Sequence, residues 1–185
     1  MTVRKITDFL VLLAFISAPA ASAQSWMTES GTAEFTSSVP LYSFTGTSEF
    51  LTGLINLADS TVDFYVDLST LKTGIGKRDK DMRLSLNVKK YPFAEFYGKL
   101  FTRIDSASTV AQNVTVEGIF TLHGVKKSVR LPGTLQALGN QLILNAQWEL
   151  NLEDYNIVPP KLLIVKVDKI QKIRISASLD PVKSP

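Results

Sequence analysis

Apolar and polar residues alternate along much of the chain from Ser60 onward. In the segment STVDFYVDLS, residues 60–69, every second residue is apolar: Val62, Phe64, Val66 and Leu68. Successive side chains of a β-strand point to opposite faces of its sheet, so this alternation predicts a strand with one buried and one solvated face. The same pattern recurs at residues 113–124, 141–151 and 170–179.

Other segments add strands to this set. Residues 92–101 begin with a proline, which a strand tolerates at its first position. The less regular stretch at residues 33–57 contains spaced apolar residues that suggest two or three more strands: Phe35, Phe44, Phe50 and Ile55. Turn signals separate the runs at His123-Gly124, Pro132-Gly133 and Gly139-Asn140.

The total is about eight strands, enough to close a barrel or to form a sandwich, and the length of the strands favours the barrel. We therefore predict one all-β domain, an extended eight-stranded antiparallel β-barrel with one or two short helices. Residues 76–92 are charged and break the alternation, which predicts a loop with one or two helical turns. Residues 159–169 fit a helix or a strand equally well, and periodicity leaves both open.

The first 23 residues have the organisation of a secretory signal peptide. Arg4 and Lys5 precede an apolar run from Phe9 to Ile16, and small residues typical of a cleavage site follow. The run is far shorter than the roughly 20 residues that cross a bilayer. We expect residues 1–23 to be removed and residues 24–185 to form the mature domain. Since the chain has no cysteine to carry a lipid anchor, we expect a soluble periplasmic or secreted protein rather than a lipoprotein.

Composition narrows the chemistry. Hydrophobic residues make up 45 % of the chain and charged residues 20 %, which is typical of a folded protein rather than a disordered one. The formal net charge of +3 is too small to indicate a nucleic-acid partner. One histidine and no cysteine exclude thiolate metal sites, disulfides, cysteine nucleophiles and multi-histidine metal centres within one chain.

Few polar residues suggest catalysis. His123 lies beside a glycine where a hairpin would turn, and we interpret it as a polar turn residue rather than a general base. Asp79 and Asp81 lack the spacing of a calcium loop and are flanked by basic residues, which favours a solvated charge cluster over a site of paired carboxylates. Alternatively, Arg78 and Asp79 form an ion pair that holds this loop. No phosphate-loop or nucleophile-elbow motif occurs in the sequence.

Large aromatic residues fall on the inward faces of separate predicted strands. They are Phe64, Phe96, Phe120 and Trp148. Such residues either pack a filled core or line a cavity for one small ligand, as eight-stranded barrels can do. Alternation reports the direction of a side chain and not whether space remains beside it, so both interpretations stay open.

Two groups of motifs carry a resemblance. The first runs through residues 60–83 and 89–96 and contains an R-D-x-x-[LM]-R loop followed by a K-Y-P-x-x-x-F strand; its matching residues are Ser69, Thr73, Gly74, Arg78, Asp79, Met82, Arg83, Lys90, Tyr91, Pro92 and Phe96. The second is a hairpin at residues 116–131, with Gly118, Thr121, Leu122, Gly124, Val125, Lys127, Val129 and Leu131. In order and spacing these motifs resemble the YceI-like family of exported lipid-binding proteins.

The resemblance implies a lipocalin-like barrel with an elongated apolar pocket. Family members of known function bind long-chain amphiphiles, including polyisoprenoids, isoprenoid quinones and fatty acids or amides. We therefore expect non-enzymatic binding, sequestration or transport of such a lipid, with no cofactor or metal required. The residues expected to line the channel for its tail are Phe64, Val66, Phe96, Phe120, Leu122 and Trp148. Arg78, Asp79 and Arg83 would either meet the head group or hold the fold.

Two other functions stay open. One is a stress-response or redox-partner module that docks on a membrane protein and carries the lipid as an accessory cofactor. The other is an enzyme of the barrel interior, such as a lipid isomerase or hydrolase, which would need two close titratable groups pointing inward. The sequence shows no such pair. Transient membrane contact and a homodimer also stay open.

Overall fold

The computed structural model describes residues 25–39, 42–105, 108–159, 161–162 and 165–182. The predicted signal peptide lies outside these residues. Long strands dominate the described part of the chain: β1 (Ser25–Val39), β2 (Tyr42–Asn56), β3 (Thr61–Asp67), β4 (Phe93–Leu100), β5 (Gln112–Leu122), β6 (Val125–Leu138), β7 (Gln141–Asn151) and β10 (Ile170–Pro181).

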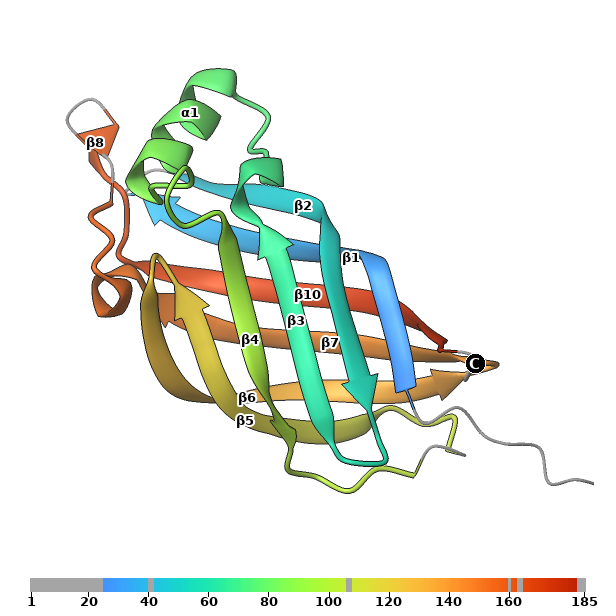
Figure 1. Ribbon diagram of the computed structural model, residues 1–185. Helices are drawn as coiled ribbons and strands as arrows, with labels where there is room; N and C mark the ends of the chain where they lie inside the picture. The colour runs from blue at the N-terminus through green and yellow to red at the C-terminus, as the bar shows by residue number, and fades with distance from the viewer. Residues whose placement is uncertain (1–24, 40–41, 106–107, 160, 163–164, 183–185) are drawn as a thin grey trace, which may run out of the picture.

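These strands form one closed ring. They are ordered β1-β10-β7-β6-β5-β4-β3-β2, each antiparallel to its neighbours, and β2 pairs with β1 to complete the circle. Figure 1 shows the strands wrapped around a single interior. The predicted eight-stranded antiparallel barrel is therefore confirmed.

Alternation decides which side chains face that interior. In β3, Val62, Phe64 and Val66 are buried, whereas the residues between them are exposed. The strand registers carry this pattern around the barrel, since Phe64 lies opposite Phe96 and Phe96 lies opposite Phe120. Three aromatic rings thus come from adjacent positions on three neighbouring strands.

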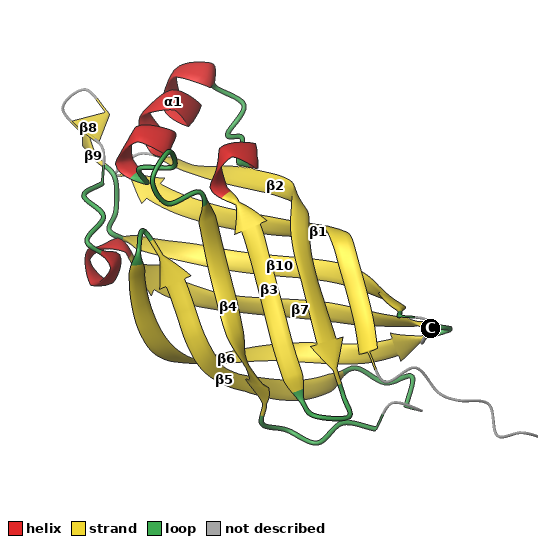
Figure 2. Cartoon of the chain, viewed as in Figure 1, coloured by secondary structure: helices red, strands yellow, loops and turns green. Residues whose placement is uncertain are grey.

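One end of the barrel is covered by the connections that contain helices (Figure 2), and we call it the helical end. These connections contain the 3₁₀ helices η1 (Leu68–Thr70) and η2 (Leu152–Tyr155), the helix α1 (Gly76–Ser85), and the short strands β8 (Lys161–Leu162) and β9 (Val165–Lys166). The helical turns predicted within residues 76–92 are confirmed as α1. For residues 159–169, where helix and strand were both open, the structure contains the paired strands β8 and β9.

The turn predicted at Pro132-Gly133 is wrong, because both residues lie inside β6. The residue opposite Pro132 is Thr115 of β5, whose N–H donates to Thr102 Oγ1 and whose C=O accepts from the N–H of Phe101. The polar backbone groups of Thr115 therefore point away from β6. At such a position of an antiparallel ladder the opposite residue also points its backbone away, so the missing N–H of Pro132 costs no bond to β5.

The pairing of β6 with β7 ends beside this proline. It runs from Leu138 opposite Gln141 to Gly133 opposite Ala146. Residues 125–132 of β6 and 147–151 of β7 continue toward the helical end without pairing with each other, and we call this stretch the seam. Both strands stay paired on their other sides, β6 with β5 and β7 with β10.

Two glycines let β4 and β5 approach closely beneath an aromatic ring. Gly98 and Gly118 lie opposite each other, and a Cβ on Gly118 would lie 2.3 Å from the Tyr97 carbonyl oxygen and 2.6 Å from the Gly98 Cα. The Phe96 ring covers the same position, with its Cζ 2.9 Å away. A side chain here would have to displace the backbone or the ring.

We expect Gly118→Ala to lower the free energy of unfolding by about 1–3 kcal/mol, the usual range for overpacking. Gly76→Ala at the start of α1 is the matched control, since no atom lies within 4 Å of its added Cβ. Alanine also favours a helix over glycine by up to about 1 kcal/mol. Urea denaturation of the two variants measures the difference, and equal midpoints would show that the glycine contact does not constrain the barrel.

Candidate functional site

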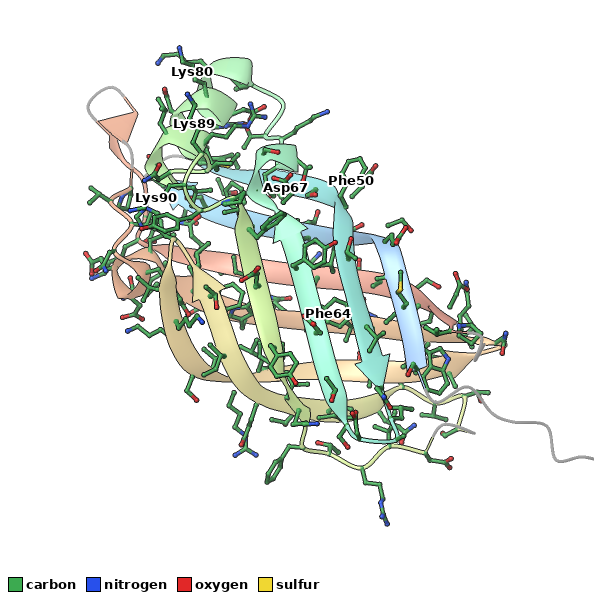
Figure 3. All side chains as sticks on the ribbon, viewed as in Figure 1. Phe50, Phe64, Asp67, Lys80, Lys89 and Lys90 are labelled. Carbon is green, nitrogen blue, oxygen red and sulfur yellow. The ribbon has the colours of Figure 1, made fainter. Side chains whose placement is uncertain are left out.

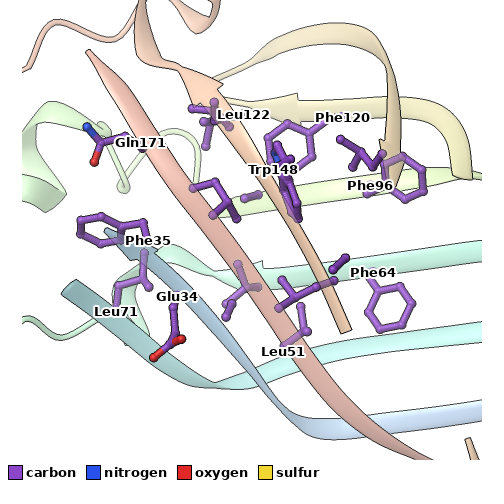
Figure 4. Close-up of a pocket in the computed structure, with 18 of the residues that line it drawn as sticks. Glu34, Phe35, Leu51, Phe64, Leu71, Phe96, Phe120, Leu122, Trp148 and Gln171 are labelled. Carbon is purple, nitrogen blue, oxygen red and sulfur yellow. The ribbon is translucent and has the colours of Figure 1, made fainter. Parts of the chain in front are cut away.

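The barrel encloses a cavity of about 220 Å³. Its wall draws residues from all eight long strands and from α1, and most of them are apolar. Figure 4 shows some of these side chains. The cavity is thus a mostly apolar space inside the barrel. Strands surround it on every side, and α1 bounds it at the helical end.

The structure brings together all six residues expected to line a lipid channel. Phe64, Val66, Phe96, Phe120, Leu122 and Trp148 all contribute to the cavity wall. Phe120 and Trp148 face each other edge to face, with ring centroids 6.2 Å apart. Because Phe120 belongs to β5 and Trp148 to β7, this contact spans the interior close to the seam. Their role in binding a ligand stays a prediction.

α1 closes the helical end with side chains that the alternation did not reveal. Met82 is buried, and it lines the cavity together with Leu86. The segment reads as strongly charged in the sequence, and its apolar positions are too few to form a pattern. The R-D-x-x-[LM]-R motif, which includes Met82, was the one available signal.

Hydrogen bonds to a buried carboxylate hold the loop before α1. Asp79 is 8 % exposed, and its Oδ1 accepts hydrogen bonds from the N–H of Thr73, at 2.8 Å, and from the Thr73 hydroxyl. The interpretation of Asp79 as part of a solvated cluster is therefore wrong, because the loop folds two donors onto it. The ion pair with Arg78 is also not formed; Arg78 Nη2 donates instead to the Thr73 carbonyl oxygen at 2.8 Å. Asp81 does stay at the surface, where it pairs with Lys77 at 3.1 Å.

Burial raises the pKa of the Asp79 carboxyl, but the two Thr73 hydrogen bonds and the positive charges of Arg83 and Arg78 lower it more. The pKa therefore lies below its usual value. A carboxyl whose pKa is lowered by folding stabilises the fold above its unfolded-state pKa, and this contribution is lost as the pH falls through the folded-state pKa. Acid therefore weakens the fastening of this loop.

The connection between β7 and β10 makes further contacts at the helical end through η2. Tyr155 of η2 is buried and meets Phe120 edge to face, with ring centroids 5.7 Å apart. Its carbonyl oxygen accepts a hydrogen bond from His123 Nδ1 at 3.1 Å. His123 itself has φ 53° in the β5–β6 turn, so its interpretation as a turn residue is confirmed. A surface ion pair of 3.5 Å between Lys127 and Asp154 joins the same two segments across the end of the seam.

Comparison with known proteins assigns this chain to a family. A sequence model of the YceI-like domain matches residues 20–179, which include both groups of motifs. This chain belongs to the YceI-like family. A comparison with curated proteins found no match.

Solved structures share the YceI-like fold at low sequence identity. A polyisoprenoid-binding domain from Saccharophagus degradans, implicated in plant cell wall breakdown, superposes with a TM-score of 0.73 at 16 % identity, covering 86 % of this chain and 99 % of that one. BcnA of Burkholderia cenocepacia gives a TM-score of 0.66 at 13 % identity, with coverages of 80 % and 95 %. The YceI protein of Campylobacter jejuni gives 0.56 at 12 % identity, with coverages of 99 % and 100 %. Among the described residues of this YceI-like chain, no helix is long and apolar enough to cross a membrane.

We expect Asp79→Asn to lower the free energy of unfolding at neutral pH by about 1–3 kcal/mol, because the Thr73 donors lose a charged acceptor. The fall in stability below about pH 4 should also become shallower, since the titrating carboxyl is gone. Asp81→Asn is the matched control, because its pair with Lys77 lies at the surface. Thermal unfolding across the acid and neutral range measures both effects, and an Asp79→Asn curve parallel to that of the wild type would contradict them.

Proposed function

We propose that this protein binds a long-chain amphiphilic lipid, of the polyisoprenoid, isoprenoid quinone or fatty acyl class, and sequesters or carries it without chemical change outside the cytoplasm. The observation that carries the proposal is the apolar cavity inside the barrel, lined by side chains from every long strand. The YceI-like family and the polyisoprenoid-binding domain with the same fold support it. The signal-peptide pattern of residues 1–23 supports the location.

Hydrophobic burial supplies the affinity in this proposal. Removing apolar surface from water is worth about 25 cal/mol per Å², so a chain that buries about 300 Å² gains about 7.5 kcal/mol. Association costs at least about 4 kcal/mol in lost translational and rotational freedom. A tail long enough to bury several hundred Å² therefore offsets this cost, whereas a short one does not.

The size of the cavity sets a condition on this mechanism. Pockets for drug-sized ligands have volumes of roughly 300–1,000 Å³, and the cavity here is about 220 Å³. A long tail therefore needs the wall to move outward. The seam is one place where such movement costs little, because separating residues 125–132 from 147–151 breaks no ladder between β6 and β7.

We expect Phe120→Trp to prevent uptake of a long-chain probe while leaving the barrel folded, because the larger ring would occupy the cavity beside Trp148. Native mass spectrometry of the mature protein incubated with a long-chain polyprenol measures the bound fraction, and the same spectra report any homodimer. Tyr97→Trp is the matched control, since Tyr97 lies on the outer face of the neighbouring strand and is 59 % exposed. Uptake by Phe120→Trp equal to that of the control would contradict the proposed position of the tail.

The wild-type sample also tests the function itself. Protein purified from its own host should release one long-chain species per barrel on organic extraction. Protein that carries nothing, and that also takes up no added polyprenol, quinone or fatty acid, would show that the interior is a packed core and would refute lipid binding.

The helical end supports transient contact with an anionic membrane surface. Residues 72–90 include seven basic and two acidic residues, although the net charge of the whole chain is only +3. The exposed cations of this segment are Lys72, Lys77, Lys80, Lys89 and Lys90. Figure 3 labels three of them at this end of the barrel. Of the two acids, Asp79 is buried and Asp81 pairs with Lys77.

Exposed apolar side chains accompany this charge. Ile75 and Leu84 are 53 % and 68 % exposed and lie in the same segment as the lysines. A cation near an anionic bilayer contributes about 1 kcal/mol of attraction, and the apolar side chains can enter the interface. Because α1 also lines the cavity through Met82, this contact would bring the ligand's binding site to the membrane that supplies it.

We expect Lys80→Glu to slow transfer of a fluorescent long-chain lipid from the protein to anionic phosphatidylglycerol vesicles several-fold at low salt. Transfer to neutral phosphatidylcholine vesicles should change little, and high salt should shrink the difference, because screening weakens surface attraction. Arg103→Glu, an exposed residue on the connection between β4 and β5, is the control of equal charge change. Equal transfer rates for the two variants would refute the membrane contact and leave lipid binding standing.

A further inference from the structure

Two buried polar side chains belong to the cavity wall, Ser37 and Gln171. They lie opposite each other on β1 and β10 at the helical end, and Ser37 also lies opposite Phe44 of β2. The guanidinium carbon of Arg78 lies 4.2 Å from the centre of the Phe44 ring. Two polar side chains thus lie next to each other on β1 and β10 in a mostly apolar cavity wall, and Figure 4 shows Gln171 at the same end as Phe35 of β1.

Ser37 costs the fold stability in the absence of a ligand. It is 0 % exposed, and its Oγ forms no hydrogen bond with any described group. A buried polar group without a partner costs about 1–3 kcal/mol. Ser48 shows the contrast, because it is equally buried, at 2 %, but its Oγ shares a hydrogen bond of 2.6 Å with Thr70 Oγ1. An alanine at position 37 would avoid this cost. A ligand that forms a hydrogen bond with the Ser37 hydroxyl would offset it.

Gln171, the residue opposite Ser37, has an amide group held in one orientation. Its Nε2 donates to the carbonyl oxygens of Asp168, at 2.6 Å, and Ile170, at 3.3 Å. Since a carbonyl oxygen can only accept, the amide nitrogen must lie on that side. No described group donates to the Oε1, so this oxygen stays able to accept a hydrogen bond. Ser37 and Gln171 together therefore offer one hydroxyl, which donates or accepts, and one acceptor.

This pattern suits a neutral head group that can donate a hydrogen bond. A hydroxyl or a primary amide can donate to Gln171 Oε1 and accept from Ser37 after a rotation of its side chain. A carboxylate can only accept and would face the lone pairs of Oε1. The charged residues of the cavity wall are Glu34, Arg78 and Asp81, which give no net positive charge to compensate a buried carboxylate.

We infer that Ser37 and Gln171 form a head-group subsite that selects amphiphiles ending in a neutral hydroxyl or primary amide over carboxylates and esters. The inference rests on the proposed lipid-binding function, since it places the polar end of that ligand. It orients the ligand with its head at the helical end, beneath α1, and its tail toward Phe64 and Phe96.

Four probes with the same 18-carbon chain test the subsite: oleyl alcohol, oleamide, oleate and methyl oleate. We expect the alcohol and the amide to bind about tenfold more tightly than the other two, since each replaces an unmade hydrogen bond. Displacement of a fluorescent fatty probe measures the four dissociation constants. Equal binding of all four would overturn the subsite while supporting lipid binding, whereas binding of none, together with no uptake of a polyprenol or a quinone, would refute the proposed function.

Variants assign the preference to the two residues. Ser37→Ala should reduce the preference for alcohol over ester several-fold and leave the melting temperature unchanged or higher. Ser48→Ala, the matched control outside the cavity, should lower the melting temperature and keep the preference. Gln171→Met should remove the preference for alcohol over oleate, and Ser37→Ala keeps the test valid if that variant does not fold. An unchanged preference in Ser37→Ala would overturn the assignment.

Discussion

The closure of the ring by β1 is the constraint on which the rest of the structure depends. This strand pairs with β2 on one side and with β10 on the other, so the first and last long strands of the described chain meet. A slip of one residue in either ladder would turn its apolar residues outward. Both registers shift between Met27 and Ala33, and such irregularities bend a strand. β1 can therefore follow the curve of the barrel while its later residues, including Ser37, keep their place in the wall.

Two kinds of contact hold the barrel. Aromatic rings fill the space above glycines of the wall, as Phe96 does over Gly98 and Gly118 and as Phe35 does over Gly46 nearer the helical end. At the helical end, hydrogen bonds of loop residues, among them those of Asp79 and His123, are added to this packing. The connections at that end are therefore held by hydrogen bonds as well as by buried side chains.

Much of this could be predicted from the sequence, because strand periodicity is a local property. It placed Phe64, Phe120 and Trp148 on the inward faces of their strands without knowledge of their neighbours. Contacts made by loops could not be predicted from periodicity, because Tyr155 contacts Phe120 only after the chain has folded. The turn predicted at Pro132 was wrong for a related reason, since a local turn signal does not reveal which way the backbone of the opposite strand points. Whether the interior is filled or open depends on the sum of many side-chain volumes, which alternation does not report.

The seam also bears on association between molecules of this protein. An unpaired strand edge is a template on which another chain can add a strand, and proteins discourage this with prolines and lysines. Along the free side of β6 stand Pro132, which lacks the N–H needed for such pairing, and the exposed Lys126 and Lys127. The proline and lysines beside the unpaired stretch therefore also disfavour the addition of a strand from a second molecule.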